Sequence, residues 1–442
     1  MSDQSCNYRG HFSWLMKSCF PNPNDKPLPD SHIPLHLHLH RQRHRQGLRL
    51  TSAASSDAAT AGMDSLSDDL LLECLSRVPP PSLPSVSLVC RRWSHLVESS
   101  AFSGFRRLRG LLRPTVFALS SSADSSCLLA ASLCFDSDPT AWRVSLFLAS
   151  DAVSLANLYS LVSHSRLSAI GPRIYIIGRS SMVCYDTWTG TVTTRSPMAS
   201  PRKKFASAAC SGKIYVAGGG GCGGSSSVDE YDPRSDTWRV VSQAPRRRYG
   251  CVGAAVDGVF YVIGGLRIGS SVSDHKPPLS AVGVGAEAHV YASSMDLYDV
   301  EKRAWLRSRS LPGGGCVVAA CAASVGHVYI LASHAVELSF WRFDGRRKTA
   351  GFGEWERLKA PPLPAQVRLD SSVRFSCVGA AERVVLVQVA GCIDDLLRRS
   401  GRAERGLREG LVLVYDTAKG EWNRGADLPE VVRRAACVSV EC

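Results

Sequence analysis

Short apolar runs with strand character recur along most of this chain. They are rich in β-branched and aromatic residues, which favour extended structure. The runs are TVFALS, RIYIIG, KIYVAGG, VFYVIGG, HVYILAS and RVVLVQVAG. Before most of them lies a second apparent strand of small residues, such as FASAAC or GCVGAAV. The pattern predicts a long β-rich region built from repeated strand pairs.

An aromatic residue followed directly by Asp comes after each of these six runs. The pairs are Phe135-Asp136, Tyr185-Asp186, Tyr231-Asp232, Tyr298-Asp299, Phe343-Asp344 and Tyr415-Asp416. In four units a tryptophan stands seven positions after the aromatic residue; the fifth unit stretches this interval to Trp355, and the second has Val192 instead. Each unit therefore predicts four strands, with a turn between the aromatic–Asp pair and the last strand.

A β-unit of roughly 45–50 residues that repeats several times is typical of a propeller. We therefore expect a mainly β fold, a six-bladed propeller over residues 113–442. The small residues fit the crowded strand nearest the axis. The first unit lacks such a strand, whereas Ala435–Val440 has its character and no unit after it. This predicts that strand 435–440 completes the first blade and closes the ring.

Ahead of the repeat, residues 63–112 predict a small helical module. Ser67 or Asp68 can cap a first helix, which Pro79–Pro81 ends because proline cannot donate the required hydrogen bond. A second helical stretch is expected from about Ser85 to Val97. The apolar positions are Leu70, Leu71, Cys74 and Leu75 in the first helix, and Leu88, Val89, Trp93 and Leu96 on one face of the second. Two such helices bury little by themselves, so their apolar face must meet the rest of the chain or a partner.

Residues 1–62 are of low complexity and are predicted to be a disordered tail. Their alternating His36, His38 and His40 are a weak metal candidate, and a polar tail explains them as well. The 16 cysteines include no Cys-x-x-Cys. Gly219–Gly224 fits G-x-G-x-x-G but leads into another strand, so no cofactor or metal is assigned.

Charge and targeting features limit which classes of partner and which compartment are expected. The net charge of +13 is spread over the repeat region, whereas nucleic-acid-binding domains concentrate their charge in one patch. No apolar run reaches spanning length, so neither nucleic acid nor a membrane is expected as a partner. The first residues lack a signal pattern and Asn-x-Ser/Thr is absent, which favours the cytosol or nucleus.

Two resemblances follow from these motifs. Gly218-Gly219, Gly264-Gly265 and the spaced Tyr–Trp pairs are similar to kelch repeats, although the other units lack the double glycine. The block LSDDLLLECLSRVPPPSLPSVSLVCRRW, residues 66–93, resembles an F-box. It departs from the F-box pattern at Ser67, where proline is usual, and at Pro84, which interrupts the second helical stretch. In this order, the two resemble the F-box/kelch-repeat proteins of plants.

The resemblance implies a non-catalytic substrate receptor of a Skp–cullin–F-box ubiquitin ligase. The F-box would bind a Skp-family adaptor, and through it a cullin, while the propeller presents the target protein. The implied adaptor-binding residues are Leu66, Leu70, Leu71, Leu75, Pro79, Leu83, Val89 and Trp93. For Leu75 and Val89, packing inside the module is at least as good an explanation. For Leu66, Leu70 and Pro79 the interface is favoured.

The target is expected at one face of the propeller. The loops that lead into the inner strands are basic, and in related kelch domains arginines at this position line the ligand pocket. The implied target-binding residues are Arg202, Lys203, Arg247, Arg248, Arg374 and Arg434. Guanidinium groups suit carboxylate and phosphate geometry, so we expect an acidic or phosphorylated target segment. Solvated turn charges are the alternative interpretation of these loops.

Two other functions compete with the ligase receptor. One is a kelch interaction scaffold whose F-box-like helices do not bind an adaptor, with Ser67 and Pro84 as the grounds. The other is a propeller enzyme, such as an oxidase or hydrolase. The histidines of the repeat region show no spacing suited to a metal site, which disfavours an oxidase.

Overall fold

The structure is a computed structural model. It describes residues 66–121, 127–135, 141–148, 165–220, 226–267, 289–323, 326–334, 337–363, 373–391, 409–432 and 434–442. The predicted tail, including His36, His38 and His40, lies outside the described residues. Asp136 does as well. None of the helices in these ranges combines the length and apolar character needed to span a membrane.

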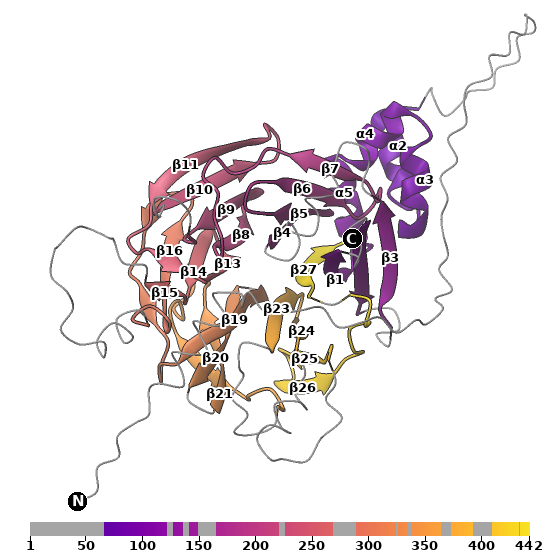
Figure 1. Ribbon diagram of the computed structural model, residues 1–442. Helices are drawn as coiled ribbons and strands as arrows, with labels where there is room; N and C mark the ends of the chain where they lie inside the picture. Colours follow the sequence, from indigo (N-terminus) through magenta and orange to yellow (C-terminus); the bar gives the residue numbers. More distant parts are fainter. Residues whose placement is uncertain are drawn as a thin grey trace, which may run out of the picture.

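Six antiparallel sheets stand around a common axis and form a six-bladed propeller (Figure 1). The inner strands are β27 (Ala436–Glu441), β4 (Arg166–Ile170), β8 (Ala206–Cys210), β13 (Val252–Val256), β19 (Cys316–Ala323) and β23 (Arg374–Ala380). The second strands are β1 (Pro114–Ser121), β5 (Arg173–Ile177), β9 (Lys213–Ala217), β14 (Val259–Ile263), β20 (His327–His334) and β24 (Arg383–Ala390). The expected fold class is confirmed.

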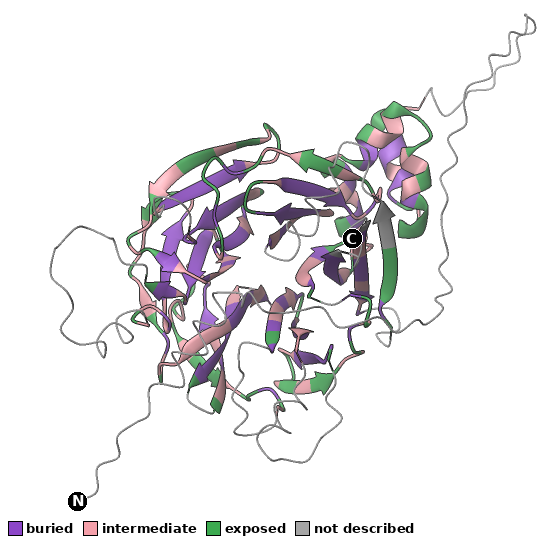
Figure 2. Ribbon diagram, viewed as in Figure 1, coloured by how far each residue is buried: buried purple, intermediate pink, exposed green. Residues whose placement is uncertain are grey.

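The outer half of each blade follows the same order. The third strands are β2 (Cys127–Cys134), β6 (Met182–Asp186), β10 (Ser227–Asp232), β16 (Ser294–Asp299), β21 (Glu337–Asp344) and β25 (Val412–Asp416). The outermost strands are β3 (Arg143–Leu148), β7 (Val192–Arg195), β11 (Thr237–Gln243), β17 (Ala304–Trp305), β22 (Trp355–Leu358) and β26 (Glu421–Arg424). Figure 2 shows that the middle strands are buried and the outermost ones mostly exposed.

Short strands decorate the third and fourth blades. β12 (Arg248–Tyr249) pairs with β15 (Leu266–Arg267), and β18 (Arg309–Ser310) extends the pairing of β16.

The C-terminal strand closes the ring. β27 pairs antiparallel with β1, which places the last strand of the chain beside the first strand of the propeller. Blade 1 is thus built from both ends of the repeat region, as the inner-strand character of residues 435–440 predicts. The backbone continues the pairing at its edge, where Arg113 and Cys442 exchange N–H···O bonds of 2.9 and 3.1 Å.

The aromatic–Asp pair has a structural role in the turns that the structure describes, those of blades 2 to 6. Tyr231 pairs across the strands with Trp238, and their ring centroids lie 5.1 Å apart. The interval of seven residues is the length of turn that brings the two rings opposite each other. The Asp carboxylate then accepts backbone N–H groups of the turn, as Asp299 does from Glu301 and Lys302. Such bonds stabilise the turn without help from another blade.

The tryptophans link neighbouring blades. Each indole Nε1 donates to a backbone carbonyl of the preceding blade, at distances of 2.7–2.8 Å. The donors are Trp142, Trp238, Trp305 and Trp422, and the acceptors are Ala426, Ser196, Gln243 and Lys359. Four of the six junctions are therefore closed by the repeat's own motif.

The inner strands crowd the axis, as their small residues predict. A Cβ at Gly379 would lie 1.9 Å from the carbonyl oxygen of Ala322 in the next blade. At Gly253 it would lie 2.5 Å from the carbonyl oxygen of Ser207. Only glycine permits this backbone approach at these two positions.

Helices precede the propeller and pack against its first two blades (Figure 1). They are α2 (Asp68–Leu75), the 3₁₀ turn η2 (Pro80–Ser82), α3 (Leu83–Ser87), α4 (Arg91–Val97) and α5 (Ser100–Leu108). The single second helix expected over Ser85–Val97 is wrong. Cys90 is extended, with φ −158° and ψ 165°, and it separates α3 from α4. Pro84 does not break a helix either, because it lies in the first turn of α3.

Candidate functional site

The helical module has its own buried core. Leu71, Leu75 and Leu83 are all at most 3% exposed and pack with α4 and α5. The prediction that these three leucines contact an adaptor is therefore corrected. Leu71 and Leu75 lie four residues apart on the inner face of α2, and Leu83 begins α3 beneath the proline turn.

A second set of apolar side chains faces solvent. Leu70 is 53% exposed, Leu88 73% and Val89 61%. Pro79 is also exposed. The suggestion that Val89 packs inside the module is wrong, because it lies in the turn that follows α3 and faces solvent. Leu88 was not among the adaptor contacts predicted from the sequence, although it was placed on the same helix face as Val89 and Trp93.

Leu66 and Trp93 lie at the border of these two sets. Both are half-buried and pack against the module's core. Arg92 holds the start of α2 against α4: its Nε donates to Asp68 Oδ1 at 2.8 Å, and its Nη2 to the Leu66 carbonyl. The exposed leucines and valine are therefore presented by a fixed backbone.

Two of the predicted target-binding arginines are structural. Arg202 is 2% exposed and Arg248 is fully buried. Arg202 Nη2 lies 2.6 Å from Asp229 Oδ2, and Arg248 Nε lies 2.8 Å from Asp296 Oδ2. The prediction that Arg202 and Arg248 line a pocket is corrected, because burial and hydrogen bonds leave neither guanidinium accessible to a ligand.

A repeated sequence feature explains this pairing. In both blades Asp stands two residues before the tyrosine of the motif, and the arginine also donates to the carbonyl of the first glycine of the pair. The glycines Gly218 and Gly264 have φ of +70° and +66°. Arginine, aspartate and double glycine occur together only in these two units of the sequence. This combination could have identified the ion pairs before the structure did.

Three other arginines converge at the same face. Arg166, Arg374 and Arg434 precede or begin the inner strands of blades 2, 6 and 1. Arg166 reaches the entries of the next two inner strands, donating from Nε to the Phe205 carbonyl before β8 at 2.7 Å and from Nη2 to the Cys251 carbonyl before β13 at 3.4 Å. Sequence reasoning missed Arg166. We call Arg166, Arg374 and Arg434 the basic mouth.

Burial and neighbouring charges lower the pKa values of two arginines of the basic mouth. Burial, and then the charge of Arg374, lower the pKa of Arg166. Partial desolvation, and then the charge of Arg434, lower the pKa of Arg374. Arg374 and Arg434 are exposed, and no carboxylate among the described residues pairs with them. A bound anion would therefore relieve repulsion that no carboxylate of the described residues compensates.

Lys203 and Arg247 are both exposed. Each adjoins one of the two buried arginines in the sequence and makes no ion pair with a described residue. They remain predicted target contacts at the rim of this face.

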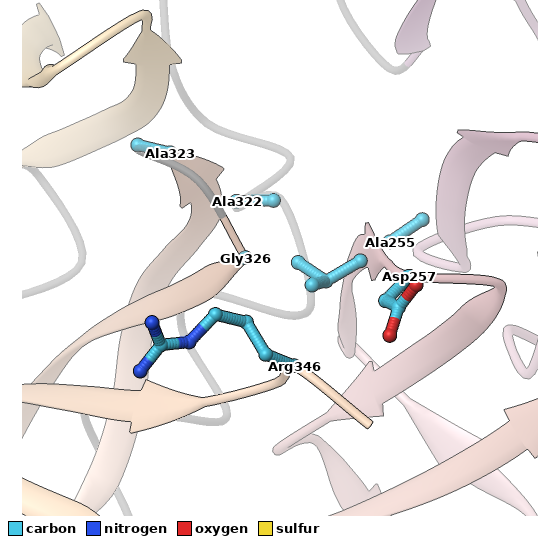
Figure 3. Close-up of a pocket in the computed structure, with 7 residues that line it drawn as sticks. Ala255, Asp257, Ala322, Ala323, Gly326 and Arg346 are labelled. Carbon is cyan, nitrogen blue, oxygen red and sulfur yellow. The ribbon is translucent and has the colours of Figure 1, made fainter. Parts of the chain in front are cut away.

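A separate cavity lies between blades 4 and 5 at the opposite face (Figure 3). Its volume is about 460 Å³, and Asp257, Gly326 and Arg346 are among its lining residues. Its charged groups are already engaged. Arg346 Nη2 pairs with Asp344 at 2.6 Å, and Asp257 accepts the backbone N–H of Arg347. We find no free recognition group here, nor a group of three metal-ligating side chains anywhere in the described ranges.

Comparison with known proteins agrees with both halves of the architecture. The family model "F-box domain" matches residues 63–103, and "Kelch motif" matches residues 201–245. The chain is 58% identical to the F-box/kelch-repeat protein At5g26960 of Arabidopsis thaliana, over 99% of each chain. The chain belongs to the F-box/kelch-repeat family.

Other F-box/kelch-repeat proteins of Arabidopsis thaliana are more distant. The protein OR23 is 31% identical, with 82% of this chain and 87% of the relative covered. The protein At1g67480 is 28% identical over 50% of this chain and 58% of its own length. Family members of this kind are F-box proteins, and the F-box typically binds Skp-type adaptors.

Proposed function

We propose that this chain is the substrate-recognition subunit of a Skp–cullin–F-box ubiquitin ligase and is not itself catalytic. The observation that carries the proposal is the exposed apolar set Leu70, Leu88, Val89 and Pro79 on an F-box that is docked to a propeller. Several large apolar side chains exposed on one small module are a common mark of a binding surface. The kelch scaffold without adaptor binding is the second candidate.

The exposed set has the character of an interface centre. Burying a leucine or valine completely is worth about 1.5–3 kcal/mol, so three such residues supply substantial binding energy. The departures at Ser67 and Pro84 do not disturb the module. Ser67 provides the carbonyl that accepts the Leu71 N–H at 3.0 Å, and Pro84 lies where a missing N–H costs nothing.

A titration against a purified Skp-family adaptor tests this surface, with two matched substitutions. Val89→Asp places a charge in the proposed interface. Val240→Asp, on the outermost strand of blade 3, changes a valine of nearly equal exposure, 60% against 61%. We expect Val89→Asp to abolish binding and Val240→Asp to leave it unchanged. Equal binding by the two variants, or no binding by folded wild type, would instead support the scaffold.

The propeller face opposite the helices is the proposed target site. The inner strands begin at this face, where the basic mouth lies, and end at the face that carries the helices. Arg374 and Arg434 are exposed like charges, so the site favours an acidic or phosphorylated segment. Lys203 and Arg247 at the rim extend the same preference.

A peptide array tests the preference for anions. It would carry serine-containing sequences in unmodified, phosphoserine and glutamate forms. We expect wild type to retain the phosphorylated or acidic forms, and Arg374→Glu/Arg434→Glu to lose them. Arg143→Glu, an exposed substitution on the outermost strand of blade 1, is the control. Retention that is the same for all three forms would contradict an anionic target.

A further inference from the structure

One tryptophan of the propeller departs from the repeat. In blade 2, Val192 takes the place of the motif tryptophan opposite Tyr185, and Trp188 instead lies in the turn between β6 and β7. The same turn position is an exposed polar residue or alanine in three other blades, at Arg234, Glu301 and Ala418. An indole at this turn position would be exposed to solvent unless another part of the chain packed on it, and Trp188 is only 2% exposed.

The cover is the F-box module. The ring of Trp188 meets the ring of Phe102 in α5 edge to face, with centroids 5.0 Å apart and planes at 80°. The guanidinium carbon of Arg106 lies 5.8 Å from the Trp188 ring and 5.7 Å from the Phe102 ring. Phe102 and Arg106 are 0% and 1% exposed. We call Phe102, Arg106 and Trp188 the joint.

Arg106 ties the joint to the rest of the module. Its Nη1 donates to the carbonyls of Ser76 and Val78, at 3.2 and 2.8 Å, just beyond the end of α2. The turn that carries Trp188 is fixed on the propeller side. The Thr187 hydroxyl donates to the Pro172 carbonyl at 2.8 Å, and the Trp188 N–H donates to Asp186 at 3.0 Å. A change of angle at the joint therefore has to break contacts on both sides.

Two ion pairs lie on either side of the joint. Arg173 at the start of β5 pairs with Glu98 at 3.2 Å, and Arg107 in α5 pairs with Glu441 at the end of β27 at 3.4 Å. Together with the covalent connection into β1, these contacts are distributed over blades 1 and 2. Attachment at several separate points resists both bending and rotation of the module.

The joint and the basic mouth lie on opposite faces. β4 begins at Arg166, β5 returns, and β6 ends at Asp186 directly before Trp188. Strands of five residues separate the two faces by roughly 17 Å of extended chain. The helices therefore hold one end of the propeller while the mouth faces away from them.

We propose that Trp188 is a positioning residue: it locks the F-box to the propeller, so that a bound target is held in one orientation relative to the ligase. This inference rests on the proposed function for its consequence, although the lock itself is a property of the free chain. Orientation decides which lysines of the target come within reach of the ubiquitin-carrying enzyme. If the joint were loose, a wider set of lysines would come within reach.

The lock is tested in the full chain by single-molecule energy transfer. Azide-bearing residues at Arg91 in α4 and Val240 in β11, both exposed, would carry donor and acceptor dyes. We expect a narrow distance distribution for wild type and a broad one for Trp188→Ala. Trp188→Phe should remain narrow, because the Trp188 indole N–H makes no hydrogen bond to any described residue. A distribution for Trp188→Ala as narrow as that of wild type would overturn the proposal.

Two controls keep the test decisive. If Trp188→Ala loses helical signal by circular dichroism, Trp188→Leu replaces it, since leucine keeps an apolar cover without the ring contacts. Adaptor affinity should be unchanged in the variants, because Trp188 is buried and does not belong to the exposed apolar set. If the wild-type chain did not bind the adaptor, the proposed function would be refuted. The distance measurement would still test whether Trp188 fixes the F-box to the propeller.

A reconstituted ligase gives the functional readout. The lysines that become modified on the chain itself would be mapped by mass spectrometry. We expect a few sites in wild type and in Trp188→Phe, and a wider set in Trp188→Ala at equal adaptor occupancy. An identical pattern in all three would show that the joint does not position the chain.

Discussion

Two neighbouring arginines, Arg247 and Arg248, give opposite predictions for stability. Arg248 is buried and donates to Asp296, and also to the carbonyls of Gly264, Tyr291 and Ser294 at 2.8–3.1 Å. Removing one partner of a buried ion pair costs about 3–5 kcal/mol. Arg246 also pairs with Asp296, so the Asp296 carboxylate keeps one cationic partner when Arg248 is removed. We therefore expect Arg248→Ala to lower the free energy of unfolding by about 3 kcal/mol, the lower end of that range.

The matched change is Arg247→Ala. Arg247 is exposed and makes no ion pair with any described residue, so its loss should change the free energy of unfolding by less than about 0.5 kcal/mol. Urea unfolding followed by tryptophan fluorescence measures both variants. Equal stability of the two variants would refute the assignment of Arg248 as a structural residue and would return it to the candidate pocket.

Three further predictions concern the ring. Gly379→Ala should cost about 1–3 kcal/mol, because its methyl group would overlap a backbone carbonyl of β19, whereas Gly104→Ala in open space should not destabilise; urea midpoints compare them, and equal midpoints would contradict the crowding at the axis. Deleting residues 435–442 removes β27, so the protein should lose cooperative unfolding by calorimetry; a sharp, unshifted transition would show that ring closure is dispensable. The hydrogen bonds from Arg346 lower the pKa of Asp344 to about 2, below its value in the unfolded chain, so this pair stabilises the fold above about pH 4 and less as the pH falls towards 2. The difference in free energy of unfolding between wild type and Arg346→Gln should therefore shrink from pH 7 to pH 3. A difference that stays constant over this range would argue against the pair.

The repeat could be predicted from the sequence because the residues that determine a blade's turns and strand spacing lie close together in the sequence of that blade. The interval between Tyr231 and Trp238 sets the turn, and the small residues of the inner strands set the spacing at the axis. These are short-range requirements that recur along the sequence, although the seven-residue interval itself occurs in four of the six units. The closing strand was predictable for the same reason, since residues 435–440 have an inner-strand pattern without a blade to follow.

The functional surfaces were less predictable because they depend on tertiary context. Arg202 and Arg247 look alike in the sequence, since both stand in basic loops after a proline. What separates them is a carboxylate two strands away, which pairs with Arg202 and buries it. Arg166 was missed because its importance comes from hydrogen bonds to two other blades, which no local pattern shows.

The helical module shows the same limit. A continuous amphipathic pattern predicted one helix over Ser85–Val97, yet the chain becomes extended at Cys90. Leu88 and Val89 lie in the turn just before this break, and both face solvent. The sequence showed only that Val192 replaces the motif tryptophan in blade 2, and it did not single out Trp188, because the F-box that covers this residue comes from a distant part of the chain.

The most direct test of the account is assembly with purified partners. The full chain would be mixed with a Skp-family adaptor and a cullin, and the mass of the product measured by light scattering after size exclusion. We expect one stable complex containing all three proteins, and loss of this chain from it when Leu70 and Leu88 are both changed to Asp. A folded wild-type chain that elutes alone would contradict the ligase role.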